Sequence, residues 1–167
     1  TANRSVVAPL DPQRIICLSS GTLRLICFLK ATERVVGIED FEKTRQTGRP
    51  YILANPELTK LPTIGPGGPG SINHEPNLEA VLKVKPDVIF ISYMEPANAD
   101  ALQKKLNIPV VVLTHGRFAS FDERVYDSLR AAGKILKREQ RAEDVISFIE
   151  SARQDLKKRT EGVDQDK

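Results

Sequence analysis

The apolar residues of this chain fall into short continuous runs separated by turn-forming residues. Four runs cover residues 14–18, 35–38, 88–91 and 110–113, and a weaker one covers 61–64. Continuous rather than alternating apolar runs of this length are typical of strands buried on both faces of a parallel sheet. The sequence therefore predicts about five short, buried strands.

Between these runs, apolar positions recur at helical spacing. Helices are predicted over residues 22–30, 77–82, 96–106 and 120–136. Asn77 is the predicted N-cap of the second of these helices, and Ser120 that of the fourth. Strands that alternate with helices favour a parallel sheet with right-handed crossovers. The predicted fold class is α/β, with a Rossmann-like parallel sheet of about five strands flanked by helices.

The last predicted helix differs from the others in length and in pattern. It runs from about residue 139 to 160, ends before Gly162, and carries a stripe spaced 3, 4, 3, 4: Ala142, Val145, Ile149, Ala152 and Leu156. At 1.5 Å per residue it would be roughly 33 Å long. The predicted division is a ligand-binding lobe over 1–137, a long helix over 138–162 and a tail over 163–167.

Composition narrows the classes of partner. The 25 basic and 22 acidic residues are interspersed and leave a net charge of +3, so no nucleic-acid partner is predicted. No apolar run approaches the ~20 residues of a membrane span. Cys17 and Cys27 both lie in apolar runs and are predicted to be core residues, with a disulfide between them left open.

Candidate binding residues follow the strands, because ligands of open parallel sheets bind beyond the carboxyl ends of the strands. The segments are 19–21, 39–41, 70–75, 92–94 and 114–118. In the long loop, Arg49 and Tyr51 add an arginine beside an aromatic ring, which suits a planar or anionic chelate. The candidate ligand-binding residues are Ser19, Ser20, Gly21, Arg49, Tyr51, His74, Tyr93, Met94, His115 and Arg117.

Other kinds of site are less well supported by the residues. His74, Glu75 and His115 offer a metal-ion-binding alternative, but no HxH or HExxH spacing accompanies them, so no metal ligands are assigned. The Gly65–Gly70 loop lacks the Lys-Ser/Thr of a phosphate loop. With no nucleophile elbow and no CxxC, binding is favoured over catalysis, and neither catalytic residues nor a cofactor are predicted.

Two further alternatives stay open. An enzyme or receiver-like α/β domain is one, although a receiver needs an acidic cluster after the first strand, where Ser19-Ser20-Gly21 stands. An interaction module whose long helix pairs with another copy of the chain is the other.

Several of these segments together resemble the periplasmic binding proteins for iron-siderophore, haem and cobalamin. The matching stretches are 14–20, 33–38, 76–82, 85–90 and 106–111, of which Asn-Leu-Glu followed by Lys-Pro-Asp-Val-Ile is the most specific. The resemblance begins near residue 13 and covers about half of the usual length of the family, so the second lobe is absent. The lack of tryptophan departs from the family's familiar chelate binders.

The resemblance implies a solute-binding component of an ABC importer that captures an iron chelate, haem or corrinoid and delivers it to a membrane permease. It implies a periplasmic or extracellular-face location, with a lipid anchor as one option. It also implies that Glu79 faces the permease and that the long helix is the spine between two lobes, whose exposed stripe pairs with the missing lobe or with a second copy.

Overall fold

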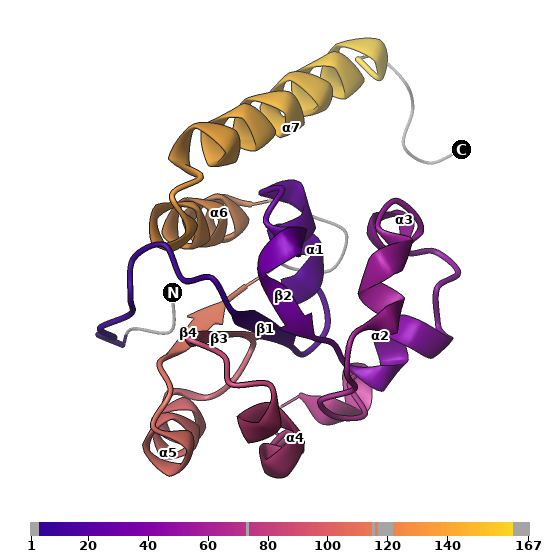
Figure 1. The fold of residues 1–167 in the computed structure, drawn as a ribbon. Coiled ribbons are helices and arrows are strands. Elements are labelled where there is room, and N and C mark those ends of the chain that lie inside the picture. The colour runs from indigo at the N-terminus through magenta and orange to yellow at the C-terminus, as the bar shows by residue number, and fades with distance from the viewer. Residues whose placement is uncertain (1–3, 73, 115, 117–121, 162–167) are drawn as a thin grey trace.

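Four parallel strands form the centre of the molecule in a computed structural model that describes residues 4–72, 74–114, 116 and 122–161. In the order β2-β1-β3-β4 across the sheet, they are β2 (Val35–Gly37), β1 (Ile15–Leu18), β3 (Val88–Ser92) and β4 (Val110–Leu113) (Figure 1). All three neighbouring pairs are parallel. The predicted α/β fold with a parallel sheet is therefore confirmed.

The two central strands are apolar at every position except Ser92, the last residue of β3. Every residue of β1 and β3 is buried, and Ile15 pairs with Val88 while Ile16 pairs with Ile89. Ile15 and Val88 belong to one hydrophobic cluster, and Ile16 and Ile89 belong to the other. Because successive side chains point to opposite faces, a strand covered on both sides needs an apolar residue at every position.

The weak strand predicted over residues 61–64 is wrong. In its place a single parallel bridge joins Ile38 to Thr63, flanked by hydrogen bonds from Ile38 N to Pro62 O and from Ile64 N to Ile38 O, both 3.0 Å. Pro62 has no N–H group to continue a ladder. Ile64 is fully buried, but Pro62 and Thr63 are exposed, so only one residue of this run belongs to the core. In the described part of the chain the sheet has four strands rather than five.

Helices cover both faces of the sheet. They are α1 (Thr22–Phe28), α2 (Asp40–Thr44), α3 (Pro50–Leu53), α4 (Leu78–Lys83), α5 (Pro96–Leu106), α6 (Glu123–Leu136) and α7 (Glu139–Arg159), with short 3-10 turns at Thr32–Arg34, Pro56–Lys60 and Pro69–Ser71. Figure 1 places α1, α6 and α7 on one side of the sheet, and α4 and α5 on the other.

The helix caps were predicted with mixed success. Asn77 caps α4 as expected, since its Oδ1 accepts the Ala80 N–H at 3.0 Å. Helix α6 begins later than predicted, at Glu123, because the Asp122 carboxylate accepts the Arg124 N–H at 3.2 Å. The expected cap Ser120 lies outside the described residues.

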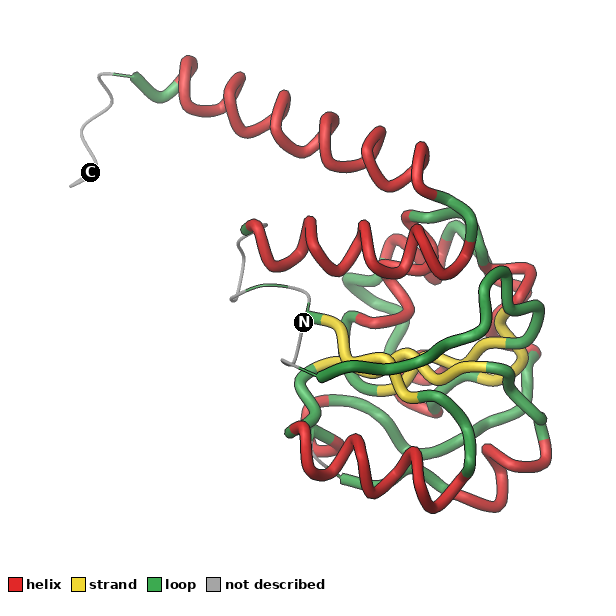
Figure 2. Tube along the Cα trace, turned by 90° about the vertical axis from the view of Figure 1, so that its left-hand side faces the viewer, coloured by secondary structure: helices red, strands yellow, loops and turns green. Residues whose placement is uncertain are grey.

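The long helix α7 packs along only part of its length. Ala142, Val145 and Ile146 are buried, and the helix is held to α6 by an ion pair between Arg130 and Glu143. All described residues from 151 to 161 are exposed, including Leu156 at 60%. Figure 2 shows that this end of α7 projects past the rest of the described chain. The long C-terminal helix is thus present, while its role between two lobes stays a prediction.

Candidate functional site

The turns that leave β1, β2 and β3 meet at the carboxyl edge of the sheet. The Ser92 hydroxyl, at the end of β3, donates to the carbonyl oxygen of Ser20 at 2.8 Å. The Glu39 carboxylate, just after β2, accepts the backbone N–H of Ser19 at 3.0 Å. Three segments that the sequence nominated separately are therefore joined into one surface.

A first depression on this edge, here called the rim hollow, is bounded by the β1 and β2 turns and by the segment 65–76. Its lining includes Ser19, Glu39, Gly67, His74 and Glu75. The structure thus brings two predicted ligand residues, Ser19 and His74, to one place. Both His74 and Glu75 are exposed, whereas Ser19 is only 4% exposed.

The β1 exit turn has an unusual backbone. Ser19 adopts a left-handed conformation with φ 64°, and Gly21, which precedes helix α1, follows with φ 86°. A non-glycine residue rarely adopts this conformation unless surrounding contacts hold it there. The hydrogen bond to Glu39 is one such contact, and it also occupies the Ser19 N–H.

Glu39 is the residue that sequence reasoning missed at this site. It is 6% exposed, and burial raises the pKa of its carboxyl group to about 7, with the Ser19 N–H opposing this and the nearby Glu42 adding to it. A carboxyl group so placed is partly neutral at physiological pH. The available signal was its position directly after a buried strand, since segment 39–41 was nominated without singling out this side chain.

A second depression, here called the β3–β4 hollow, lies beside the rim hollow at the ends of those two strands. Tyr93 and Met94, both predicted, line it with Thr114, Arg124 and Asp127. Tyr93 has φ 56°, is 36% exposed, and donates its hydroxyl hydrogen to the carbonyl oxygen of Gly116. Met94 is buried at 4%.

Arg124 and Asp127 were not predicted for the site. They come from the first turn of α6, which the fold brings to the ends of β3 and β4. Arg124 pairs with Asp122 at 2.7 Å, and the guanidinium holds the pKa of that carboxyl group below its usual value. An arginine in a depression of this kind offers hydrogen-bond donors to an anionic ligand.

Arg49 and Tyr51 line neither of these two hollows. Both are engaged with the buried Glu42: the Tyr51 hydroxyl donates to its carboxylate at 2.9 Å, and the Arg49 Nε lies 3.7 Å from the same carboxylate. Arg49 also donates to the carbonyl oxygen of Phe41 at 3.0 Å and lies 4.2 Å above its ring. This network fastens α3 to α2. Tyr51 also lines a separate hollow of about 560 Å³, together with Phe28 and Asn55, and a ligand-binding role for either side chain stays a prediction.

The remaining candidates are separate from these clusters. His115 and Arg117 lie outside the described residues. Within the described ranges no group of three His, Cys, Asp or Glu side chains is close enough to hold a metal ion. Glu79 is exposed in the first turn of α4.

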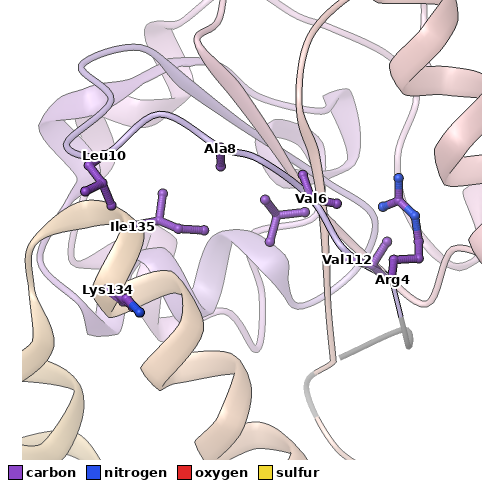
Figure 3. A pocket seen from close by; sticks show the side chains of 8 residues that line it. Arg4, Val6, Ala8, Leu10, Val112, Lys134 and Ile135 are labelled. Carbon is purple, nitrogen blue, oxygen red and sulfur yellow. The ribbon is translucent and has the colours of Figure 1, made fainter.

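Another depression lies between the N-terminal segment, β4 and α6 (Figure 3). Its lining is largely aliphatic, with Val6, Leu10 and Ile135 among its members. Arg4 is fixed there by hydrogen bonds to Asp100 at 2.8 Å and to the carbonyl oxygen of Val110 at 2.8 Å. These contacts bind the N-terminal segment to the edge strand β4 rather than offering groups to a ligand.

The two cysteines are free thiols in the structure. Burial raises the pKa of both, and that of Cys27 reaches about 12, so both side chains are neutral and unreactive at physiological pH. Among the helices of the described part of the chain, none combines the length and the apolar character needed to cross a bilayer.

Comparison with known proteins gives a family for this arrangement. The profile of the family described as "Periplasmic binding protein" matches residues 15–167. A sequence relative is the molybdate-binding protein MolA of Haemophilus influenzae, 32% identical over 112 residues, which are 67% of this chain and 30% of MolA. Another is the uncharacterized ABC transporter substrate-binding lipoprotein YvrC of Bacillus subtilis, 24% identical over 99% of this chain and 47% of the relative.

Solved structures agree. MolA bound to molybdate superimposes with a TM-score of 0.78 at 25% identity, covering 99% of this chain and 54% of MolA. The petrobactin-binding protein YclQ of Bacillus subtilis gives a TM-score of 0.69 at 19% identity, over 96% of this chain and 55% of YclQ, and shows a shared fold. The chain spans less than half of the length of the curated relatives it matches.

Proposed function

This chain belongs to the periplasmic binding protein family, and from that premise we propose that it is the N-terminal lobe of the solute-binding component of an ABC importer. In this role it captures a small metal-containing ligand and presents it to a membrane permease. Location on the periplasmic or extracellular face of the membrane follows from the family and from its lipoprotein relative. The relatives are binding proteins and not enzymes, in agreement with the prediction from the sequence.

The observation that carries the proposal is the convergence of the strand exits at one edge of the sheet. The β1, β2 and β3 turns are linked there by the Glu39–Ser19 and Ser92–Ser20 hydrogen bonds, and two hollows lie side by side. On its own the rim hollow has a volume of about 10 Å³, room for about one water molecule, and the β3–β4 hollow has a volume of about 320 Å³. A second lobe that closes over them would complete a cleft and exclude water from the ligand.

The ligand class is proposed as an anionic metal species. The sequence favoured an iron chelate, haem or corrinoid, and Tyr93 and Arg124 in the β3–β4 hollow suit such a ligand by stacking and by charge-assisted hydrogen bonds. A metal oxyanion is the second candidate, favoured by the 32% identity to a protein named for molybdate binding. An oxyanion would use the same hydrogen-bond donors but needs less room.

Titration of the full-length protein separates these candidates. Calorimetry with molybdate, a ferric siderophore, haem and cobalamin should give saturable binding of one class, and substitution of Arg124 by alanine should weaken it at least tenfold. Glu123→Ala, which removes the adjacent charged side chain, serves as the matched control. If the full-length protein binds none of these four compounds, the assignment of a metal-containing ligand is wrong.

We further propose that Glu79 contacts the permease. The side chain is exposed in the first turn of α4, where a carboxylate also interacts favourably with the helix dipole. In vesicles that contain the cognate permease and its ATPase, Glu79→Lys should abolish stimulation of ATP hydrolysis while ligand affinity stays unchanged. Glu123→Lys, in the first turn of α6, should leave the stimulation intact.

The exposed end of α7 is proposed as the spine that leads to the second lobe. Ala152 and Leu156 continue the stripe of Ala142 and Val145 but are exposed. If the helix instead pairs with another copy of the chain, light scattering of the 167-residue protein will show a dimer that Leu156→Glu dissociates.

A further inference from the structure

A buried glutamate, Glu39, connects two of the segments that form the rim hollow. Glu39 follows β2, and its side chain crosses to the neighbouring β1 turn, where one oxygen, Oε1, accepts the Ser19 N–H at 3.0 Å. That N–H belongs to a residue in the left-handed region, with φ 64°. A backbone donor that is buried at 4% exposure needs an acceptor, and Glu39 supplies it from a different strand.

A second segment is fastened to the same residue. We call residues 65–71 the glycine loop. Its backbone docks on the start of α2 through hydrogen bonds from Asp40 N to Gly65 O and from Phe41 N to Pro66 O, both 2.9 Å. Gly67 has φ 69°, and a Cβ there would lie 2.5 Å from the Cβ of Glu39 and 2.6 Å from its Oε2. The loop thus lies directly against the Glu39 side chain, with room for glycine alone.

Neither lysine nor arginine is among the described residues that line the rim hollow. The ionisable groups near it are Cys17 from β1 and Glu42 from α2, while His74 and Glu75 line the same hollow. Burial raises the pKa of Glu39 to about 7. The hydrogen bond to Ser19 can form with either protonation state, since a carboxyl oxygen accepts in both.

We infer that Glu39 is a positioning residue, which fixes the β1 exit turn and the glycine loop relative to each other and so shapes the surface that meets the ligand. This inference rests on the proposed function for its biological meaning, because the rim hollow matters only if ligand binds at this edge. The junction itself is a property of the lobe and can be measured without any ligand.

The junction is expected to respond to pH. Below neutral pH the carboxyl group is neutral and fits a closed, poorly hydrated contact with Gly67. Above neutral pH the group is ionised and hydration of the carboxylate is favoured, because a buried charge without a nearby cation is costly. Ionisation therefore loosens the glycine loop and shifts the Ser19 amide resonance with a midpoint near 7.

Amide hydrogen exchange and chemical shifts of the 15N-labelled chain test the inference. Glu39→Ala should lower at least tenfold the protection of the Ser19 amide and of the Asp40 and Phe41 amides, which donate to the glycine loop, while Glu39→Gln, which keeps an acceptor oxygen, should retain the protection. The pH titration of the Ser19 amide should be lost in Glu39→Gln. Since histidine changes charge in the same range, His74→Gln is the control that should keep the titration, and Glu75→Ala the one that should keep protection.

Two results overturn the inference. One is wild-type protection of the Ser19, Asp40 and Phe41 amides in Glu39→Ala, and the other is a loss of protection in Glu39→Gln as large as in Glu39→Ala. If Glu39→Ala does not fold, the Ser19 titration in Glu39→Gln decides alone, and its persistence overturns the inference. Binding of molybdate by the full-length protein is measured separately. Absence of that binding counts against the oxyanion ligand and leaves the result on Glu39 standing.

Discussion

Glu39 and Glu42 are two buried carboxyl groups three residues apart, and they have opposite surroundings. Glu42 is 5% exposed and is met by the Tyr51 hydroxyl at 2.9 Å and by the Arg49 guanidinium at 3.7 Å. Glu39 is 6% exposed and is met by one backbone N–H, at the edge of the rim hollow. Burial raises the pKa of both groups.

This difference indicates a purely structural role for Glu42 and leaves a role in the candidate site open to Glu39. At Glu42 the tyrosine and the arginine both direct their polar groups to the glutamate carboxylate, so the cluster ties α2 to α3 and has little left for a ligand. At Glu39 the polar partner is the backbone of a turn that itself faces the candidate cleft. Two equally buried glutamates therefore have different roles, because different groups form their hydrogen bonds.

The largest expected effect is on the pH dependence of stability through Glu39. Because its folded-state pKa of about 7 lies above the unfolded value of 4.5, the unfolded chain releases this proton first as pH rises. The contribution of Glu39 to the free energy of unfolding is therefore complete below about pH 4.5. It decreases as the pH rises to about 7, by at most roughly 3 kcal/mol. Glu39→Gln lacks this loss and should be more stable than wild type at pH 8.

Urea denaturation of both proteins from pH 4.5 to 8 measures the difference. Glu75→Gln is the control, since it removes an exposed carboxylate of the same hollow and should follow the wild-type curve. A difference between Glu39→Gln and wild type that is constant across this range would show that Glu39 does not titrate as described.

The next effect is at the contact between the glycine loop and Glu39. Gly67→Ala combines a positive φ with a Cβ that meets Glu39 at 2.5 Å, and it should cost about 2 kcal/mol. Gly70→Ala is the matched control, because a Cβ at Gly70 has nothing within 4 Å and should change stability by less than about 0.5 kcal/mol. Equal effects of the two substitutions in thermal denaturation would contradict the close packing on Glu39.

Breaking the Glu42 cluster should affect stability and spare binding. Arg49→Ala and Tyr51→Phe should each cost about 1–2 kcal/mol, because each removes hydrogen bonds to a buried partner. Ligand affinity of the full-length protein should change less than threefold. The opposite pattern, with unchanged stability and affinity lowered tenfold or more, would place both side chains in the binding site after all.

The smallest effect on stability is expected at Glu79. Glu79→Gln removes a first-turn charge from α4 and should cost about 0.5 kcal/mol, within reach of careful urea denaturation. Glu123→Gln in α6 should behave alike. A loss above about 2 kcal/mol would indicate that Glu79 has a structural role in the lobe beyond the helix dipole.

Much of the architecture was predictable because local patterns report burial directly. The continuous apolar runs of β1 and β3 predicted strands covered on both sides, and the helix Pro96–Leu106 was predicted with its bounds. The weaker run 61–64 contains Pro62 and Thr63, both exposed, and forms a single bridge. Uninterrupted apolar runs therefore identified buried strands, whereas the run that proline interrupts did not.

The site was predictable as a set of segments but not as a set of side chains. Ser19, Tyr93 and Met94 follow strands, His74 lies in the loop between β2 and β3, and all four line the two hollows. Arg49 and Tyr51 were proposed as ligand-binding residues from their chemistry. In the structure both contact Glu42, and no local sequence pattern indicates that pairing.

The amino-acid order alone determined the parallel α/β fold, the edge of the sheet at which the strand exits meet, and the presence of a long final helix, because each of these follows from spacing between neighbours along the chain. The tertiary structure decided which polar side chains are satisfied internally and which remain at the edge. That choice depends on distances between residues of different elements, such as Glu39 and Ser19, and such distances exist only once the chain has folded.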